Sequence, residues 1–197
     1  LRFNLDLPVG QSTAELIYTI QSSGEIEVAV TAHPKGKDVP MLPRFGMQAE
    51  IPANLSQWKW YGRGPTENYN DRRDGTWIGQ HTGTVDDLFN LYLDPRESGN
   101  RTSIRWTTFT DQGGKGLRVD TIGPHLLEVA AYPFSPLDIE LARHPIDLRR
   151  SPTNIINLDF GQLGLGGTNS WGQLPLEKYR LPPGKPYHYS FRLSPQR

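Results

Sequence analysis

Short stretches in which apolar and polar residues alternate recur along the chain, and glycine- and proline-rich segments separate them. Residues 14–20 (AELIYTI) and 25–32 (EIEVAVTA) are two such stretches, and Ser22, Ser23 and Gly24 lie between them. A period of two is typical of a half-buried β-strand, because successive side chains point to opposite faces. The two stretches therefore predict a β-hairpin.

The same reasoning predicts further strands along the rest of the chain. They cover residues 42–51, 57–64, 101–109, 116–122, 126–132, 155–160 and 187–193. Within 57–64, Trp58 and Trp60 share one face, so we expect both rings to lie in a core or an interface.

Two segments do not follow the strand pattern. Residues 62–83 are dense in charged and aromatic residues, and we expect a loop there. Residues 136–142 predict a short helix, because Ser135 can cap it, Pro136 suits the first position and Asp138 completes a capping box.

Composition supports one all-β domain. The chain has 197 residues with 20 glycines, 17 prolines and no cysteine, so disulfides, thiol catalysis and cysteine-ligated zinc are excluded. The 21 basic and 21 acidic residues are interspersed, which argues against a nucleic-acid partner. No apolar run approaches the roughly 20 residues that span a bilayer. We expect a large antiparallel β-sandwich over residues 1–197, cut from a longer polypeptide.

Acidic residues in two loops are candidates for acid–base chemistry. Glu67 and Asp71 follow Pro65, and Glu97 follows Pro95. Arginines are close by in sequence, and they lower carboxylate pKa values, which is unsuitable for a general acid. Ion-paired loop clamps are therefore the favoured interpretation. The arginines in question are Arg63, Arg72, Arg73, Arg96 and Arg101.

The histidines do not have metal-ligand spacings. They are His33, His81, His125, His144 and His188. His125 and His144 adjoin prolines and are expected to be turn residues. Paired with Glu128 or Glu140, either could instead serve as a general acid and base, as an aldose epimerase requires.

A glycine-rich stretch near the end of the chain carries an isolated tryptophan, Trp171, beside the polar residues Thr168, Asn169 and Ser170. Two interpretations remain open at this point. The indole can fold back and cover an edge of the core. Alternatively, its face can receive a sugar, whose C–H groups suit an aromatic platform while its hydroxyls need polar partners.

Several segments together resemble the C-terminal domain of large, lacZ-type β-galactosidases of glycoside hydrolase family 2. They are PRFGM (43–47), WYGRGPTENYNDR (60–72), LDPRESGNR (93–101), NLDFGQLGLGGTNSWGQLP (157–175) and YRLPPGKPYHYSFRL (179–193). Residues 1–42 are less distinctive, and we expect them to begin the same sandwich.

The resemblance implies a supersandwich of the galactose-mutarotase-like type within an enzyme that hydrolyses terminal β-D-galactosides with retention. The catalytic glutamates belong to a TIM barrel outside this chain, so no catalytic residue is assigned here. The tryptophan of the GGxxSW motif, here Trp171, stacks on the aglycone sugar, with Asn169 and Ser170 beside it. Thr168 and Asn169 stand where some members carry acidic residues, which can alter the preferred acceptor sugar.

The resemblance also implies partners. They are the barrel of the same polypeptide, a β-galactoside or aglycone sugar, and further copies in a homo-oligomer. It implies no cofactor in this domain, since the magnesium and sodium ions of full-length members bind elsewhere. Two alternatives remain on the same sandwich: an aldose epimerase, and a carbohydrate-binding module that uses Trp58, Trp60, Trp77 and Trp106.

Overall fold

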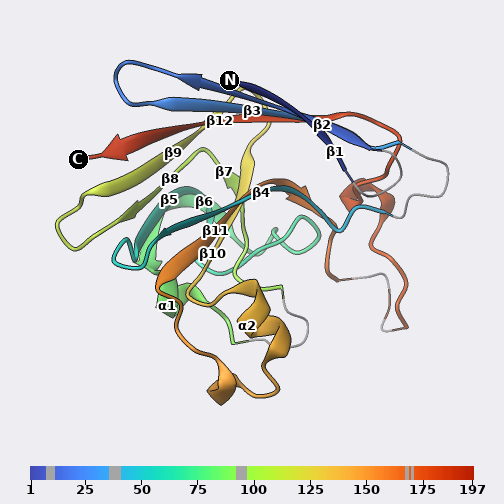
Figure 1. Ribbon diagram of the computed structural model, residues 1–197. Coiled ribbons are helices and arrows are strands. Elements are labelled where there is room, and N and C mark those ends of the chain that lie inside the picture. Colours follow the sequence, from blue (N-terminus) through green and yellow to red (C-terminus); the bar gives the residue numbers. More distant parts are fainter. Residues whose placement is uncertain (8–11, 36–40, 92–96, 167–168, 170) are drawn as a thin grey trace.

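The chain folds into two antiparallel β-sheets that pack face to face, as the computed structural model shows (Figure 1). The structure describes residues 1–7, 12–35, 41–91, 97–166, 169 and 171–197. The predicted all-β antiparallel sandwich with at most one or two short helices is confirmed.

The larger sheet has eight strands in the order β1-β2-β3-β12-β9-β8-β5-β6. Their bounds are β1 (Arg2–Asp6), β2 (Thr13–Ile20), β3 (Ile26–His33), β12 (Tyr187–Gln196), β9 (Gly116–Ile122), β8 (Trp106–Thr110), β5 (Gln57–Gly64) and β6 (Trp77–Thr84).

The smaller sheet has four strands in the order β4-β11-β10-β7. Their bounds are β4 (Arg44–Pro52), β11 (Thr153–Gln162), β10 (Leu127–Tyr132) and β7 (Arg101–Ile104). The short α-helices in the described part of the chain are α1 (Val85–Leu88) and α2 (Pro136–Leu141), and the single 3₁₀ turns are η1 (Pro145–Asp147) and η2 (Glu177–Tyr179). No helix in the described ranges has the length and apolar character of a membrane span.

The core lies between the inner faces of the two sheets. Ile156 and Leu158 of β11 and Val129 of β10 belong to the same buried cluster as Trp58 and Trp60 of β5. Both indole N–H groups are satisfied, because Trp58 donates to Thr107 Oγ1 at 2.8 Å and Trp60 donates to the Arg63 carbonyl at 2.9 Å. The prediction that these two tryptophans are buried is confirmed.

The outer face of the smaller sheet has a different character. A second apolar cluster, formed by Ile139 of α2, Phe89, Tyr132 and their neighbours, covers one part of it. Beside this cluster, β11 turns Asn157 and Asp159 outward. Asp159 pairs with Glu128 of β10, and Asn157 pairs with Gln48 of β4. The outer face therefore has a polar region next to an apolar one.

Most predicted elements are present. The hairpin of 14–20 and 25–32 is formed by β2 and β3, which pair from Thr13 opposite His33 to Ile20 opposite Ile26. Helix α2 begins where expected, and the Ser135 hydroxyl accepts the backbone N–H of Asp138 at 3.0 Å.

Two expectations were wrong. The expected loop 62–83 contains strand β6, an edge strand whose side chains are mostly exposed and so show no alternation. The expected strand 101–109 is divided into β7 and β8, which belong to different sheets. The chain leaves the smaller sheet after Ile104 and joins the larger one at Trp106. The sequence reasoning also missed β1 and α1.

The inner face of β11 supplies a direct test of the sandwich. Ile156 is 0% exposed, so Ile156→Ala should lower the free energy of unfolding by about 3 kcal/mol through lost burial and the cavity left behind. Ile146 is 92% exposed, and Ile146→Ala should change it by less than about 0.5 kcal/mol. Urea unfolding of both variants measures the difference, and equal effects would contradict this packing.

Candidate functional site

The segment after β11 leaves the sheet and presents Trp171 to solvent. The indole side chain is 92% exposed, so it does not cover an edge of the core. Asn169 accepts the backbone N–H of Trp171 on Oδ1 at 2.9 Å and donates to Gln173 Oε1 at 3.0 Å. Of the three predicted sugar-binding residues, Trp171 and Asn169 therefore lie on one turn, and Ser170 lies outside the described residues.

Asp71 anchors the base of this loop. Its Oδ2 atom accepts the backbone N–H of Gly166 at 2.5 Å. Gly164 also lies against the carboxyl group, since a Cβ atom added there would stand 2.6 Å from Asp71 Cγ. Glycine at position 164 thus permits a close approach that any side chain would block.

The carboxylate of Glu67, which is close to Asp71 in sequence, has a different set of hydrogen-bond partners. It accepts the Arg72 guanidinium at 2.6 Å, the Asn90 amide at 2.6 Å and the Gly99 backbone N–H at 2.7 Å. The expected ion-paired clamp is confirmed for Glu67 and Arg72. Asp71 instead binds the tryptophan loop.

The other predicted arginines mainly bind backbone carbonyls. Arg63 donates to the carbonyls of Arg73 and Thr76, at 3.0 and 2.7 Å. Arg101 donates to the Gly99 carbonyl at 2.7 Å, and its guanidinium lies 5.4 and 5.3 Å from the ring centres of Trp58 and Trp60. Arg73 donates to the Asn70 side chain at 3.1 Å, and Arg96 lies outside the described residues.

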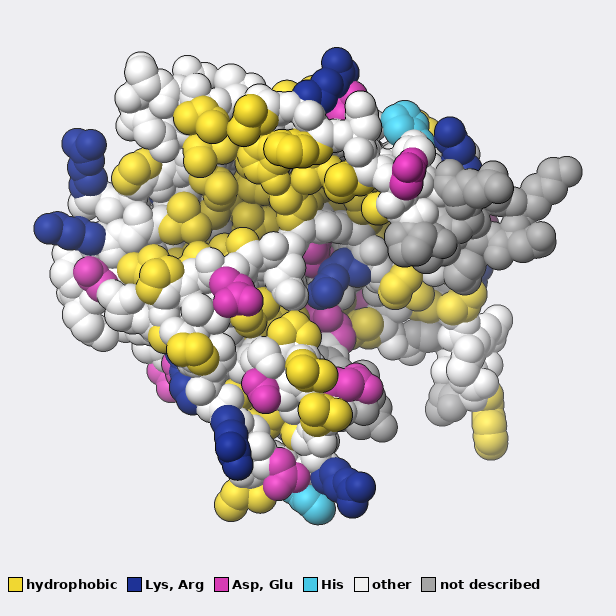
Figure 2. Space-filling model, in the orientation of Figure 1, with side chains coloured by type: hydrophobic (Ala, Val, Ile, Leu, Met, Phe, Trp, Pro, Cys, Tyr) yellow, Lys and Arg dark blue, Asp and Glu magenta, His cyan; other side chains and the backbone are white. Residues whose placement is uncertain are grey.

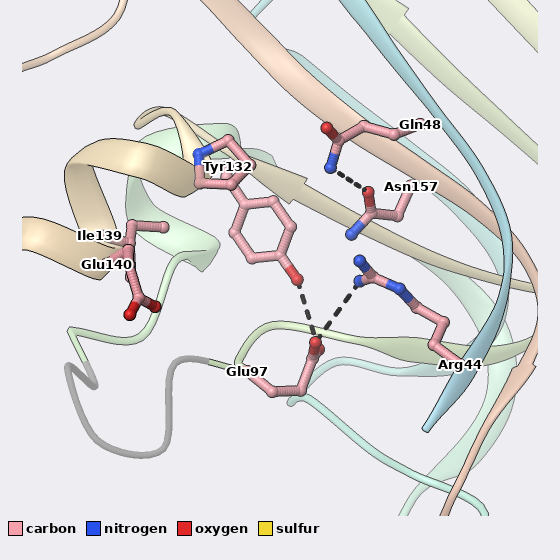
Figure 3. A pocket seen from close by; sticks show the side chains of 8 residues that line it. Arg44, Gln48, Glu97, Tyr132, Ile139, Glu140 and Asn157 are labelled. Carbon is pink, nitrogen blue, oxygen red and sulfur yellow. Dashed lines mark hydrogen bonds and ion pairs between the residues drawn. The ribbon is translucent and has the colours of Figure 1, made fainter. Parts of the chain in front are cut away.

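A polar cavity of about 300 Å³ lies on the outer face of the smaller sheet, beside α2 (Figure 3). Strands β4, β10 and β11, helix α2 and the segment around Glu97 form its walls. The described side chains that line it are Arg44, Gln48, Glu97, Tyr132, Pro136, Ile139, Glu140 and Asn157. We call it the β11 pocket. In the space-filling view, basic and acidic side chains meet in a hollow between the apolar surface of β1–β3 and α2 (Figure 2).

Glu97 is the most connected group of the β11 pocket. Its Oε1 atom accepts hydrogen bonds from the hydroxyls of Tyr69 and Tyr132, at 3.2 and 3.3 Å, and from the Gln162 amide at 3.4 Å. Its Oε2 atom pairs with Arg44 at 3.5 Å. Burial raises the pKa of Glu97, and the positive charge of Arg44 partly opposes this rise.

Two further buried carboxyl groups lie next to it. Burial raises the pKa of Glu128 to about 7, against the hydrogen bonds that Asn100 and Asn70 donate to its carboxylate at 3.0 and 2.5 Å. Burial likewise raises the pKa of Asp159 well above its ordinary value, although Arg44 Nε stands 3.9 Å away. The region thus holds three carboxyl groups that resist ionisation near one arginine.

The histidines do not assemble an epimerase-like pair with Glu128. The His125 ring stacks on Phe160 with centroids 3.7 Å apart, and its Nε2 lies 2.6 Å from the Phe160 carbonyl oxygen. His144 lies on an exposed turn, 3.6 Å from Asp147. Within the described ranges, no group of three or more His, Asp or Glu side chains could hold a metal ion.

Sequence reasoning missed the β11 pocket. Its signal was nonetheless present, because Asn157 and Asp159 interrupt an otherwise apolar strand at alternate positions. Amide and carboxylate side chains on one face of a buried strand indicate a polar structure on that face. Arg44 and Glu97, which are far apart in sequence, meet there only in the folded chain.

Two curated relatives of this chain are both named β-galactosidase. The chain is 32% identical over 194 residues to a protein named β-galactosidase from Priestia megaterium, covering 98% of this chain and 18% of that protein. It is 37% identical over 168 residues to a β-galactosidase from Lactobacillus delbrueckii subsp. bulgaricus, covering 85% of this chain and 16% of the relative. The chain therefore spans less than a fifth of the length of these relatives.

A solved structure and a family model complete the comparison. The structure of a galactose mutarotase related enzyme from Lactobacillus acidophilus has a TM-score of 0.48 and 12% identity, covering 100% of this chain and 67% of that one. Residues 2–193 match the model of the family described as "Beta galactosidase small chain". Because the match runs over nearly all of the sequence, this chain belongs to the β-galactosidase small-chain family.

Proposed function

We propose that this chain is the C-terminal domain of a β-galactosidase that hydrolyses terminal β-D-galactosides with retention, and that Trp171 forms the aglycone wall of its active site. The observation that carries the proposal is the exposed indole on an anchored loop, in a chain of the β-galactosidase small-chain family. The catalytic carboxylates of a retaining glycosidase, about 5 Å apart, are supplied by another part of the polypeptide.

Stacking a sugar on the indole has a predictable magnitude. A pyranose face covers about 100 Å² of apolar surface, and its burial contributes about 2 kcal/mol at the usual coefficient. That free energy corresponds to a change in acceptor affinity of about thirtyfold. The ring therefore sets how long an aglycone sugar stays in place, while bond cleavage depends on the acids elsewhere.

Asp71 is the positioning residue in this proposal. Its carboxylate holds Gly166 five residues before Trp171, and Gly164 packs against the same group. A charge-assisted hydrogen bond to a backbone N–H is stronger than a neutral one, so the base of the loop is fixed while the indole stays exposed. Asn169 then holds the turn that carries the ring.

Removing the ring should weaken acceptor binding. In the full-length enzyme, Trp171→Ala should raise the acceptor constant for glucose about tenfold or more, and should shift the balance from transfer toward hydrolysis. Trp77, which is 61% exposed on β6, provides the matched control through Trp77→Ala. Kinetics with and without added glucose measure the effect. An unchanged acceptor constant in Trp171→Ala would exclude the stacking role.

Weakening the hydrogen bond between Asp71 and Gly166 should also weaken acceptor binding. Asp71→Asn keeps an acceptor oxygen but loses its charge, so it should weaken acceptor binding several-fold and leave the hydrolysis of an activated aryl galactoside largely intact. The control is Asp111→Asn, since Asp111 also accepts two backbone N–H groups, at 2.8 and 3.0 Å, in the β8–β9 turn. Equal effects of the two variants on acceptor binding would remove Asp71 from this role.

The isolated 197-residue chain should lack glycosidase activity. The proposal assigns both catalytic carboxylates to another part of the polypeptide, so a chromogenic β-galactoside should not be turned over by the purified chain. The full-length enzyme, assayed at equal molar concentration, is the positive control. The proposal would be overturned if turnover copurified with the chain and were absent from a mock preparation. The catalytic carboxylates would then lie within these 197 residues.

A further inference from the structure

The β11 pocket contains a buried hydrogen-bond donor that the fold leaves unused. Asn157 is 1% exposed, and its Nδ2 atom has no partner among the described residues. Its Oδ1 atom accepts the Gln48 amide at 3.0 Å, which fixes the orientation of the group. In the close-up, Nδ2 points into the space between Tyr132 and Arg44 (Figure 3). Buried donors in folded proteins are almost always paired, so this one indicates a missing partner.

Acceptors face the same region. The Oδ2 atom of Asp159 is buried without a hydrogen bond to any residue that the structure describes, and Arg44 Nε stands 3.9 Å from it. The carboxylate of Glu97 lies at the mouth of the pocket, between Tyr132 and Arg44 (Figure 3). An incoming group would meet both donors and acceptors within one small cavity.

The charges of the pocket narrow the class of ligand. Two carboxyl groups, those of Glu97 and Glu140, line the pocket, and that of Asp159 lies close to Arg44. An anion would approach these groups with Arg44 as the one cation among the described lining residues. A metal ion is disfavoured, because the described residues contain no cluster of three suitable ligands. A neutral ligand whose groups both donate and accept fits this arrangement, and hydroxyl groups do both.

The remaining wall, on the side of α2, combines apolar side chains with the carboxyl group of Glu140. Ile139 of α2 and the ring of Tyr132 lie on the side of the cavity opposite Arg44 and Gln48 of β4 (Figure 3). Pro136 of α2 also lines the cavity. The cavity volume of about 300 Å³ is at the small end of ligand sites, which suits a ligand of about 12 non-hydrogen atoms. A pyranose has this size, a rim of hydroxyls and C–H groups on its faces.

We propose that the β11 pocket is a monosaccharide-binding site that takes a neutral hexopyranose. The hydroxyl oxygens of the sugar accept hydrogen bonds from the Asn157 amide and the Arg44 guanidinium, and a hydroxyl group donates to the Glu97 carboxylate. The C–H groups of the sugar pack against Ile139 and Pro136. None of the described residues that line the pocket belongs to the Trp171 loop. The inference therefore does not depend on the aglycone role of that loop.

The test follows the Asn157 side-chain amide directly. The ¹⁵N-labelled 197-residue chain is titrated with D-galactose and, separately, D-glucose, and the Asn157 amide pair is identified by its loss in Asn157→Asp. At least one of the sugars should shift this pair saturably, with a dissociation constant in the millimolar range expected for about 12 non-hydrogen atoms. Sodium phosphate at matched ionic strength should not shift it. Selective asparagine labelling gives the same readout in the full-length polypeptide.

Matched arginine variants separate binding from general effects. Arg44→Met should weaken the sugar about tenfold, because it removes a charged donor from an exposed position on β4. Arg192→Met should leave the affinity unchanged. The Arg192 side chain is 40% exposed and paired with Glu27, whereas that of Arg44 is 37% exposed and paired with Glu97.

Three results would overturn the proposal. The first is the absence of a saturable shift with either sugar, and the second is an equal loss of affinity in the two arginine variants. The third is a loss of binding in Trp171→Ala with the Arg44→Met variant unaffected, which would place the sugar on the tryptophan loop. This last result would leave the aglycone role of Trp171 standing, so the two proposals fail separately.

Discussion

Strand β11 presents Ile156 and Leu158 to the core and Asn157 and Asp159 to the opposite side of the smaller sheet. Because side chains alternate along a strand, a register slip of one residue would exchange these two sets. It would move the carboxyl group of Asp159, which is already buried, from beside Arg44 into the aromatic core, and an unpaired buried charge is among the costliest changes a fold can make. The register of β11 is thereby fixed. The floor of the β11 pocket and the starting point of the Trp171 loop follow from it.

Residues 68–71 connect the smaller sheet to the base of the Trp171 loop through hydrogen bonds. Asn68 accepts the backbone N–H of Thr102 at 2.9 Å and its hydroxyl at 2.6 Å. Asn70 donates to Glu128 on β10, and Asp71 accepts from Gly166. Four consecutive residues thus bind β7, β10 and the base of the tryptophan loop. The three contacts therefore share one short backbone segment.

Period-two alternation predicted the strands that have one face buried in the core, because burial of that face imposes the pattern. It did not reveal β6 (Trp77–Thr84), which lies at the edge of the larger sheet and buries little. The alternation of Leu1, Phe3 and Leu5 was visible and would have identified β1. Helix α1 has four residues, which is too short to display a helical period.

The features of the two candidate sites also differ in how far the sequence alone reveals them. A tryptophan among glycines is conspicuous in a sequence, and this pattern singled out Trp171 but left open whether it covers the core or receives a sugar; the family resemblance then implied the second role. The contact of Asp71 with Gly166 spans 95 residues and uses a backbone donor, which has no side-chain signature. Asn157 and Asp159 were visible as polar residues in an apolar strand. Which of their atoms lack a partner depends on Gln48 and Arg44, and so on the pairing of β11 with β4.

Tryptophan occurs in this chain in two opposite environments, and the contrast explains why an exposed indole can be useful. Trp58 and Trp60 are 0% exposed, and removing these rings from water stabilises the fold. Trp171, at 92% exposure, contributes almost nothing of this kind, so its apolar surface remains available to a ligand. That surface gains free energy only when something covers it. Because Asp71 fixes the base of the loop beforehand, less of that gain is lost to ordering the chain at the moment of binding.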